Sequence, residues 1–167
     1  MLPKEFDLNL VSSLNNSSLQ QGNTMNKNGP VIIIEDDADD QDILKEVFEK
    51  LEYPNELIFF FDGQHALDFL NATDTIPFLI LSDINMPKLD GFALRTKLKT
   101  DAQLEVKCIP YLFFSTALNQ KAVINAYSLS VQGFFIKQTS MSELEKAITV
   151  IMEYWKRCAA PNNFAKK

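Results

Sequence analysis

Acidic side chains are crowded together directly after the first apolar run of the chain. Four apolar residues, Val31–Ile34, are followed at once by Glu35 and Asp36, and more aspartates come within the next six positions. A second apolar run, "FLILS", leads directly into Asp83. Carboxylates held close together repel one another, and a hard divalent cation bound by their oxygen atoms removes that conflict. These residue types predict a site for Mg²⁺, an ion that also binds phosphate groups.

Hydroxyl and ammonium groups follow two later apolar runs. Ser115 and Thr116 end the stretch "YLFFST", and Lys137 follows "GFFI". A lysine ammonium is a good point-charge partner for a phosphate, and a hydroxyl can donate a hydrogen bond to a phosphoryl oxygen. A carboxylate such as that of Asp83 can act as a nucleophile. If these groups meet in one cleft, they supply the parts for transfer of a phosphoryl group to an aspartate.

The elements that must position these groups alternate regularly along the chain. Apolar periodicity predicts strands at Val31–Ile34, Leu57–Phe61, Phe78–Ser82, Tyr111–Ser115 and Gly133–Ile136, and helices at Asp39–Leu51, Gln64–Leu70, Phe92–Lys99, Gln120–Leu129 and Ser140–Arg157. Continuous apolar strands indicate a parallel sheet that is covered on both faces. We therefore expect an α/β fold with a doubly wound five-stranded parallel sheet. In the strand order 2-1-3-4-5, the first and third strands are neighbours, and ligands bind at the carboxyl ends of the strands.

Four segments in this order carry a resemblance to a known family. They are "VIIIEDD", "LILSDINMPKLDG", "LFFSTA" and "GFFIK", and the similarity extends from Pro30 to Trp155. Together they resemble the receiver domain of two-component response regulators, a flavodoxin-like fold. The stretch "DINMPKLDG" is the most specific single motif.

The resemblance implies a role for each residue of the site. Asp83 resembles the phosphoacceptor. The implied metal ligands for Mg²⁺, for which Mn²⁺ can substitute, are Glu35, Asp36, Asp83 and the backbone carbonyl of Asn85. Lys137 resembles the lysine that pairs with the phosphoryl group. Ser115, which lies 22 residues before Lys137, resembles the switch hydroxyl, and Thr116 takes that role if the register shifts by one. Phe134 resembles the switch aromatic residue.

One position departs from the family pattern. The family usually has Lys-Pro after the fifth strand, often with a cis peptide bond, and this chain has Lys137-Gln138. A cis bond before glutamine costs about 3 kcal/mol, so the loop is either trans or cis under strain.

The implied function is that of a response regulator in a two-component phosphorelay. A histidine kinase or phosphotransfer protein would supply the phosphoryl group, and an unknown downstream protein would receive the signal in the cytoplasm. A homodimer that forms through the face of the last two helices and the last strand is a further alternative. The chain would not be a turnover enzyme, although the family dephosphorylates itself slowly.

Two other functions remain to be weighed. The first is a binding module of the same fold that no longer uses phosphorylation, which the Gln138 departure favours weakly. The second is a phosphatase of the haloacid dehalogenase type, which needs a D-x-D pair directly after the first strand. Here Asp37-x-Asp39 comes one residue too late, and no cap domain fits the length.

Composition limits the classes of partner. A net charge of −6 argues against a general binder of nucleic acid or anionic membranes. The longest apolar runs, such as "IPFLIL", have about six residues, far short of the ~20 in a membrane helix. No secretory signal is expected. Cys108 and Cys158 form no metal or redox motif.

The expected domain organisation has three parts. Residues 1–29 are rich in Asn, Ser and Gln and predict a disordered extension, residues 30–158 the receiver domain, and residues 159–167 a flexible tail. Met25 is a candidate native start, which would make residues 1–24 dispensable. His65 is interpreted as an ordinary helix residue. Four further acids are interpreted as solvated first-turn and surface residues: Asp37, Asp39, Asp40 and Asp42.

Overall fold

A five-stranded parallel sheet forms the centre of the molecule. The computed structural model describes residues 26–116 and 119–159. The strand order is β2-β1-β3-β4-β5, and every neighbouring pair is parallel. The predicted fold class and strand order are therefore confirmed. The strands are β1 (Val31–Ile34), β2 (Leu57–Phe60), β3 (Leu79–Ser82), β4 (Tyr111–Ser115) and β5 (Gly133–Ile136).

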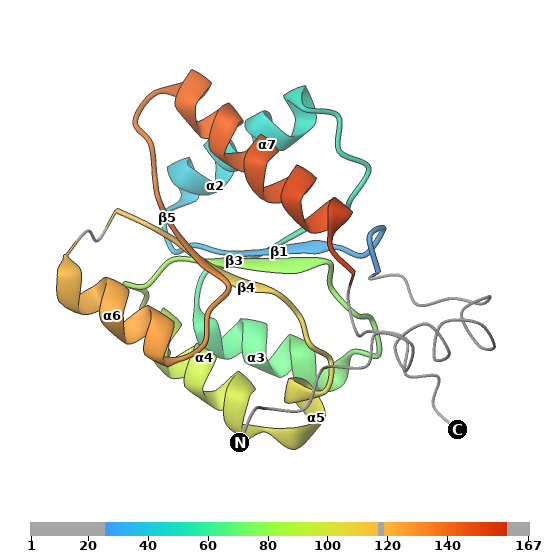
Figure 1. Cartoon of the computed structure of the whole chain (residues 1–167), viewed down its shortest axis with the longest axis vertical. Helices are drawn as coiled ribbons and strands as arrows, with labels where there is room; N and C mark the ends of the chain where they lie inside the picture. Colours follow the sequence, from blue (N-terminus) through green and yellow to red (C-terminus); the bar gives the residue numbers. More distant parts are fainter. Residues whose placement is uncertain (1–25, 117–118, 160–167) are drawn as a thin grey trace, which may run out of the picture.

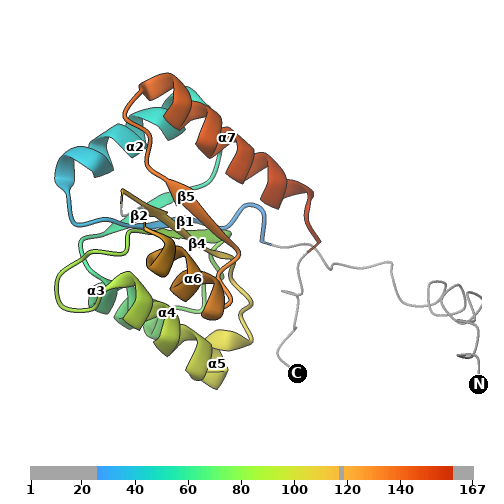
Figure 2. The ribbon, with the colours of Figure 1, turned by 60° about the vertical axis from the view of Figure 1, so that its left-hand side comes forward.

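Helices cover both faces of this sheet. They are α2 (Ala38–Lys50), α3 (Gly63–Ala72), α4 (Gly91–Thr100), α5 (Ala102–Glu105), α6 (Gln120–Ser128) and α7 (Met141–Arg157). Figure 1 shows α2 and α7 on one face and α3, α4, α5 and α6 on the other, and Figure 2 shows the same layers from a second direction. The predicted helices are present, and none of their ends is shifted by more than two residues. The short helix α5 was not predicted.

The continuous apolar strands are explained by their place in the sheet. Successive side chains of β1 point to opposite faces: Ile33 joins the core under α2 and α7, and Ile32 and Ile34 join the core over α3 and α4. All four residues of β1 and all four of β3 are buried. The edge strand β2 is only half-buried, and Phe61 just after it is 54% exposed, because β2 has a neighbouring strand on one side only.

Short polar side chains fix the starts of the helices. The N-caps include Asp37 for α2, Asp62 for α3, Asp90 for α4 and Ser140 for α7. Each side chain accepts hydrogen bonds from first-turn backbone N–H groups that have no partner within the helix. At the start of α7, the Ser140 hydroxyl accepts a hydrogen bond from the Glu143 N–H, while the Glu143 carboxylate pairs with Lys146.

The start of the fold lies a little before the expected boundary at residue 30. The backbone at residues 26–29 forms a turn, and the Asn55 amide donates to the carbonyl oxygens of Lys27 (2.8 Å) and Gly29 (2.7 Å). These four residues, expected to be part of the extension, therefore contact the domain. The rest of the extension (residues 1–25, with the hypothesis about Met25) and residues 160–167 of the tail lie outside the described residues. Among the helices that the structure describes, none has the length and apolar character needed to cross a membrane.

Candidate functional site

Three carboxylates come together where β1 and β3 end. These two strands are neighbours, with Ile34 paired to Ser82, so the residues that follow them, Glu35 and Asp83, emerge side by side. The Asp83 N–H donates to the Ile34 carbonyl at 2.9 Å and fixes this register. With Asp36, one oxygen atom from each carboxylate lies within 4.8 Å of the others. The predicted acidic cluster is therefore assembled by the fold.

Asp83 is held at the bottom of this cluster by donors from its own loop and from β4. The side chain is buried, and its Oδ1 accepts a hydrogen bond from the Ile84 N–H at 2.6 Å. The Ser115 hydroxyl, which is fully buried at the end of β4, also donates to Oδ1. Thr116 is exposed. The hydroxyl that reaches Asp83 is thus that of Ser115, and the alternative register with Thr116 has no support in this geometry.

Lys137 completes the cleft from the end of β5. Its ammonium group pairs with Glu35 and lies 2.8 Å from Asp40 Oδ2 and 3.4 Å from Asp83 Oδ2. Burial disfavours the ammonium ion, but the hydrogen bonds to Asp40 and Glu35 outweigh it and raise the pKa of Lys137 above its usual value. The cleft therefore contains a fixed positive charge beside the Asp83 carboxylate.

Glu35 is the most deeply buried carboxylate of the cluster. It is 2% exposed, and burial raises its pKa although Lys137 and the Asp37 N–H act in the opposite direction. A divalent cation would lower the cost of keeping this carboxylate ionised. The donor set consists of oxygen atoms alone, which suits hard cations such as Mg²⁺ and Mn²⁺. It lacks the sulfur and nitrogen ligands that zinc prefers.

The loop after β3 places Asn85 at the rim of the cleft, where its side chain is exposed. This loop is tied at three points. The Gly91 N–H donates to the Ile84 carbonyl at 2.9 Å, the Gly63 N–H donates to the Leu89 carbonyl at 3.2 Å, and Lys88 forms an ion pair with Asp62. The backbone that carries the Asn85 carbonyl is therefore held at both ends.

Phe134 lies on β5, half-buried, with its ring centroid 6.1 Å from that of Phe113. It packs against the core from its edge and is not fully enclosed by it. The described chain contains no cis peptide bond, so the Lys137-Gln138 bond is trans. With this backbone, Lys137 still reaches the acidic cluster.

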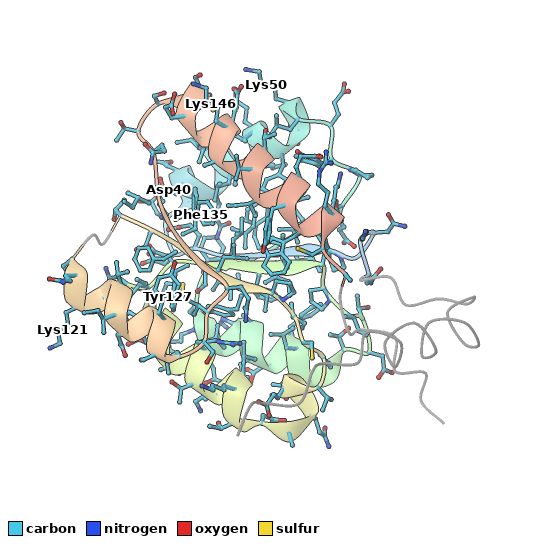
Figure 3. The ribbon with its side chains drawn as sticks, viewed as in Figure 1. Asp40, Lys50, Lys121, Tyr127, Phe135 and Lys146 are labelled. Atoms are coloured by element: carbon cyan, nitrogen blue, oxygen red, sulfur yellow. The ribbon has the colours of Figure 1, made fainter. Side chains whose placement is uncertain are left out.

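Asp40 is a residue of the cleft that the sequence analysis placed on the surface. It lies in the first turn of α2, and its carboxylate contacts Lys137 instead of facing only solvent. Figure 3 shows Asp40 at the end of the sheet where β5 leads into α7. Its position along the chain could have identified it. The first turn of the helix after β1 lies at the carboxyl ends of the strands, and Lys137, which follows β5, lies at the same edge of the sheet.

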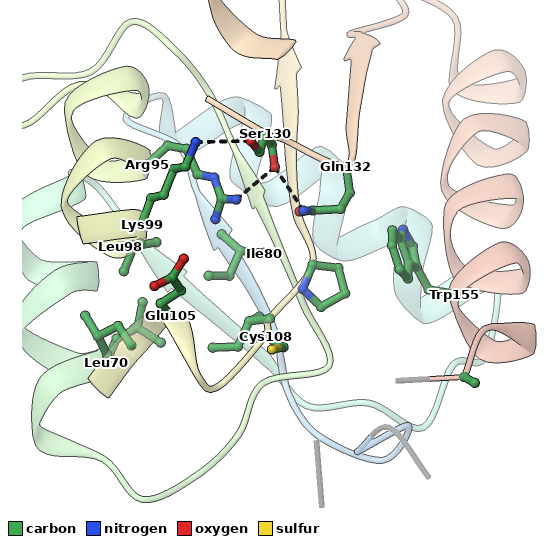
Figure 4. Close-up of a pocket in the computed structure, with 14 residues that line it drawn as sticks. Leu70, Ile80, Arg95, Leu98, Lys99, Glu105, Cys108, Ser130, Gln132 and Trp155 are labelled. Carbon is green, nitrogen blue, oxygen red and sulfur yellow. Dashed lines mark hydrogen bonds between the residues drawn. The ribbon is translucent and has the colours of Figure 1, made fainter. Parts of the chain in front are cut away.

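A cavity of ≈ 370 Å³ lies at the opposite end of the sheet and is structural in character. Its lining includes Pro110 and Gln132, which precede β4 and β5. Its two cationic side chains donate hydrogen bonds to the loop before β5. Arg95 donates to the carbonyl of Ser130 at 2.8 Å, and Lys99 donates to the Ser130 hydroxyl at 3.1 Å (Figure 4). Arg95 and Lys99 therefore tie α4 to that loop.

Comparison with known proteins agrees with the geometry. The family model of the response regulator receiver domain matches residues 31–149. The response regulator Rcp1 of Synechocystis is 31% identical over 130 residues, which cover 75% of this chain and 87% of the relative. A crystal structure of the Mn²⁺-bound form of Rcp1 is 29% identical with a TM-score of 0.68, and covers 78% of this chain and 96% of that chain.

A further solved structure has the same fold. The phosphorylated cyanobacterial phytochrome response regulator RcpA is 29% identical with a TM-score of 0.70, over 78% of this chain and 96% of that chain. The family match spans most of the described fold and contains the acidic cluster, Ser115 and Lys137. The chain therefore belongs to the family of response regulator receiver domains.

Proposed function

We propose that Asp83 accepts a phosphoryl group from the phosphohistidine of a histidine kinase or phosphotransfer protein. The observation that carries this proposal is the pair of contacts on the Asp83 carboxylate. Ser115 donates to Oδ1, and the Lys137 ammonium lies 3.4 Å from Oδ2. Donors at the carboxyl ends of two different strands thus flank one carboxylate, and both can interact with a phosphoryl group attached to it.

The chemistry follows from these positions. An oxygen of Asp83 attacks phosphorus, the new P–O bond forms as the P–N bond to the donor histidine breaks, and the imidazole takes a proton from solvent. Lys137 places a positive charge beside the transferred group. The Ser115 hydroxyl then donates to a phosphoryl oxygen instead of to Oδ1.

The acidic cluster is the proposed metal site. Glu35, Asp36 and Asp83 would bind Mg²⁺ through carboxylate oxygens, with the backbone carbonyl of Asn85 as a further ligand. When bound, the ion neutralises negative charge on the phosphoryl group as it is transferred. The Mn²⁺-bound form of Rcp1 supports a divalent ion in this family and Mn²⁺ as a substitute.

The proposed output surface is the face formed by α6, β5 and α7. Four large apolar side chains on its two helices are at least 58% exposed: Ile124, Tyr127, Val150 and Tyr154. Figure 3 shows Tyr127 and Phe135 on this side of the molecule. When Ser115 moves toward the phosphoryl group, Phe134 turns inward and shifts a two-state equilibrium of this face. The face would bind a downstream protein in the cytoplasm or a second copy of the chain.

Two alternative functions are less well supported. A binding module without phosphorylation would not need Ser115, Lys137 and the acidic cluster in one cleft. A turnover phosphatase is disfavoured because its D-x-D pair is absent: Asp37 caps α2, and Asp39 is exposed in its first turn. Receiver domains are in general signalling proteins, and the proposed self-dephosphorylation is slow and not a turnover activity.

Intact-mass analysis tests this function. The protein is incubated with phosphoramidate, whose P–N bond resembles that of phosphohistidine, in the presence of Mg²⁺. The expected result is the addition of one phosphoryl group, which is absent in Asp83→Asn and in a sample with EDTA. A wild-type protein that gains no phosphoryl group, while Mg²⁺ still binds, would support the phosphorylation-independent binding module.

A further inference from the structure

We propose that Asp40 is a positioning residue that holds the Lys137 ammonium in place for phosphoryl transfer, an inference that rests on the proposed function of Asp83. Three carboxylates surround this ammonium group. Glu35 and Asp83 belong to the acidic cluster, and Asp40 approaches from α2 with Oδ2 at 2.8 Å. Among the described residues, the cluster suited to a metal contains the first two but not Asp40.

The difference between these carboxylates matters once a cation is bound. A divalent ion shares the negative charge of Glu35 and Asp83, so their attraction for Lys137 becomes weaker. Asp40 keeps its full charge because it stands outside the cluster. It is then the carboxylate that continues to orient the lysine while the phosphoryl group arrives.

Lys137 needs such an anchor because its ammonium is carried on a flexible four-carbon chain. Fixing a long side chain in one rotamer costs up to about 2 kcal/mol of conformational entropy. The Lys137 side chain is only 10% exposed, while that of Asp40 is 39% exposed, so one partner of the ion pair is largely shielded from water. This contact therefore differs from a surface ion pair between two exposed side chains, which contributes little.

The backbone of α2 holds Asp40 rigidly with respect to the cleft. The Asp37 carboxylate caps the helix and accepts from the Asp40 N–H at 3.4 Å. Gln41, the next residue, donates from its side-chain amide to the Glu35 carbonyl at 2.6 Å. The first turn of α2 is thus hydrogen-bonded to Glu35, the first residue of the acidic cluster, and this restrains the backbone from which Asp40 reaches Lys137.

The sequence offers a matched control for this proposal. Asp39 is the other acid in the first turn of α2, is exposed, and makes no ion pair within the part of the chain that the structure describes. The change Asp39→Asn removes the same charge from the same helical turn. It therefore measures how the loss of one negative charge changes the reaction rate with an anionic phosphodonor when the contact to Lys137 is kept.

The first experiment measures the rate of phosphorylation by phosphoramidate with Mg²⁺. We expect Asp40→Asn to slow it by roughly tenfold, the lower end of the range for loss of a hydrogen bond to a charged group. Asp39→Asn should stay within about twofold of the wild type, as expected for an exposed charge, and Asp40→Glu should restore part of the rate. In a Lys137→Met background, Asp40→Asn should have no further effect. An equal effect with and without Lys137 would overturn the proposal.

A second experiment does not depend on phosphorylation. NMR relaxation of the Lys137 side chain measures its motion in Mg²⁺-loaded protein. Asp40→Asn should make the lysine ε-methylene clearly more mobile, and Asp39→Asn should not. If the wild type accepts no phosphoryl group, the proposed function fails while this result still decides on Asp40. A lysine that stays equally restrained in Asp40→Asn would show that Asp40 does not position it.

Discussion

The Ser115 hydroxyl donates a hydrogen bond to the Asp83 carboxylate, although the two residues are 32 positions apart in the chain. The contact exists because β3 and β4 are neighbours and both residues stand at the carboxyl ends of their strands. Both side chains are buried, so water cannot easily replace the hydroxyl. The state of the Asp83 carboxylate is therefore coupled to the position of a β4 residue.

Substitution of Ser115 tests this coupling. In Ser115→Ala the carboxylate loses a donor, and a hydrogen bond to a charged group contributes about 1.5–3 kcal/mol. We expect phosphorylation to slow by about tenfold and the amide shifts of Phe134 on addition of beryllofluoride to shrink. Heteronuclear NMR and intact mass measure the two effects. Thr116→Ala, which removes the neighbouring exposed hydroxyl, should change neither. If Thr116→Ala had the larger effect, the switch hydroxyl would be misassigned.

Gly91 is required by a close approach of backbone to backbone. A Cβ at this position would lie 2.3 Å from the Asp83 carbonyl oxygen and 2.8 Å from the Phe113 ring. Gly91→Ala should therefore lower the free energy of unfolding by about 1–3 kcal/mol and slow phosphorylation, because the Asp83 backbone must move. Urea denaturation measures the first effect. Gly133→Ala, whose Cβ would first meet the Leu112 side chain at 3.2 Å, should cost less. Equal costs would contradict this explanation.

The lowered pKa of Asp62 leads us to expect that the stability of the fold depends on pH in a specific way. Burial acts to raise its pKa, but hydrogen bonds from Lys88 and His65 outweigh it and lower the pKa from 3.8 to about 2. Because the folded-state pKa lies below the unfolded value, the group stabilises the fold above pH ~4 and loses this contribution as the pH falls towards ~2. At neutral pH the contribution is about 2 kcal/mol.

Asp62→Asn separates this charge from helix capping, since asparagine also caps helices well. We expect the free energy of unfolding to fall by about 2 kcal/mol at pH 7, with the difference from the wild type vanishing near pH 2. Urea denaturation at several pH values measures it. The control is Asp90→Asn, which changes the N-cap of α4, a residue with no ion pair among the described residues. A difference that stays constant with pH would show that charge is not the cause.

We expect the substitution Asp36→Asn to have opposite effects on stability in the absence and in the presence of Mg²⁺. Asp36 is the exposed member of the cluster. Without metal, Asp36→Asn relieves repulsion, so its melting temperature should equal or exceed that of the wild type. Saturating Mg²⁺ at about 100 times its Kd should stabilise the wild type by about 2.7 kcal/mol and the variant much less. Asp37→Asn, at the cap outside the cluster, should respond like the wild type. Equal stabilisation of Asp36→Asn would remove Asp36 from the site.

The sequence was sufficient to predict the sheet and the residues that end its strands. Four-residue apolar runs such as Val31–Ile34 are unambiguous because both faces of a central strand are buried. The carboxyl ends of parallel strands meet at one edge of the sheet, so Glu35, Asp83 and Lys137 were predicted to lie together.

The parts that could not be predicted depend on contacts between side chains far apart in sequence. Asp40 and Asp39 look alike in the sequence, and only the position of Lys137, 97 residues later, distinguishes them. Ile43 belongs to the apolar periodicity of α2 yet is 41% exposed, while the polar Gln41 is buried because its amide binds the Glu35 carbonyl. The backbone of Lys88 adopts a φ of 63°, a conformation that its residue type does not favour, where it forms the ion pair with Asp62.

The phosphoryl group can be located chemically, which tests directly whether Asp83 is the phosphoacceptor. After incubation with phosphoramidate and Mg²⁺, borohydride reduces an aspartyl phosphate to homoserine, and peptide mass spectrometry identifies the modified residue. We expect homoserine at Asp83 alone, and none in a sample treated with EDTA. Homoserine at another aspartate, or a phosphoryl group that resists borohydride, would contradict the assignment of Asp83 as the phosphoacceptor.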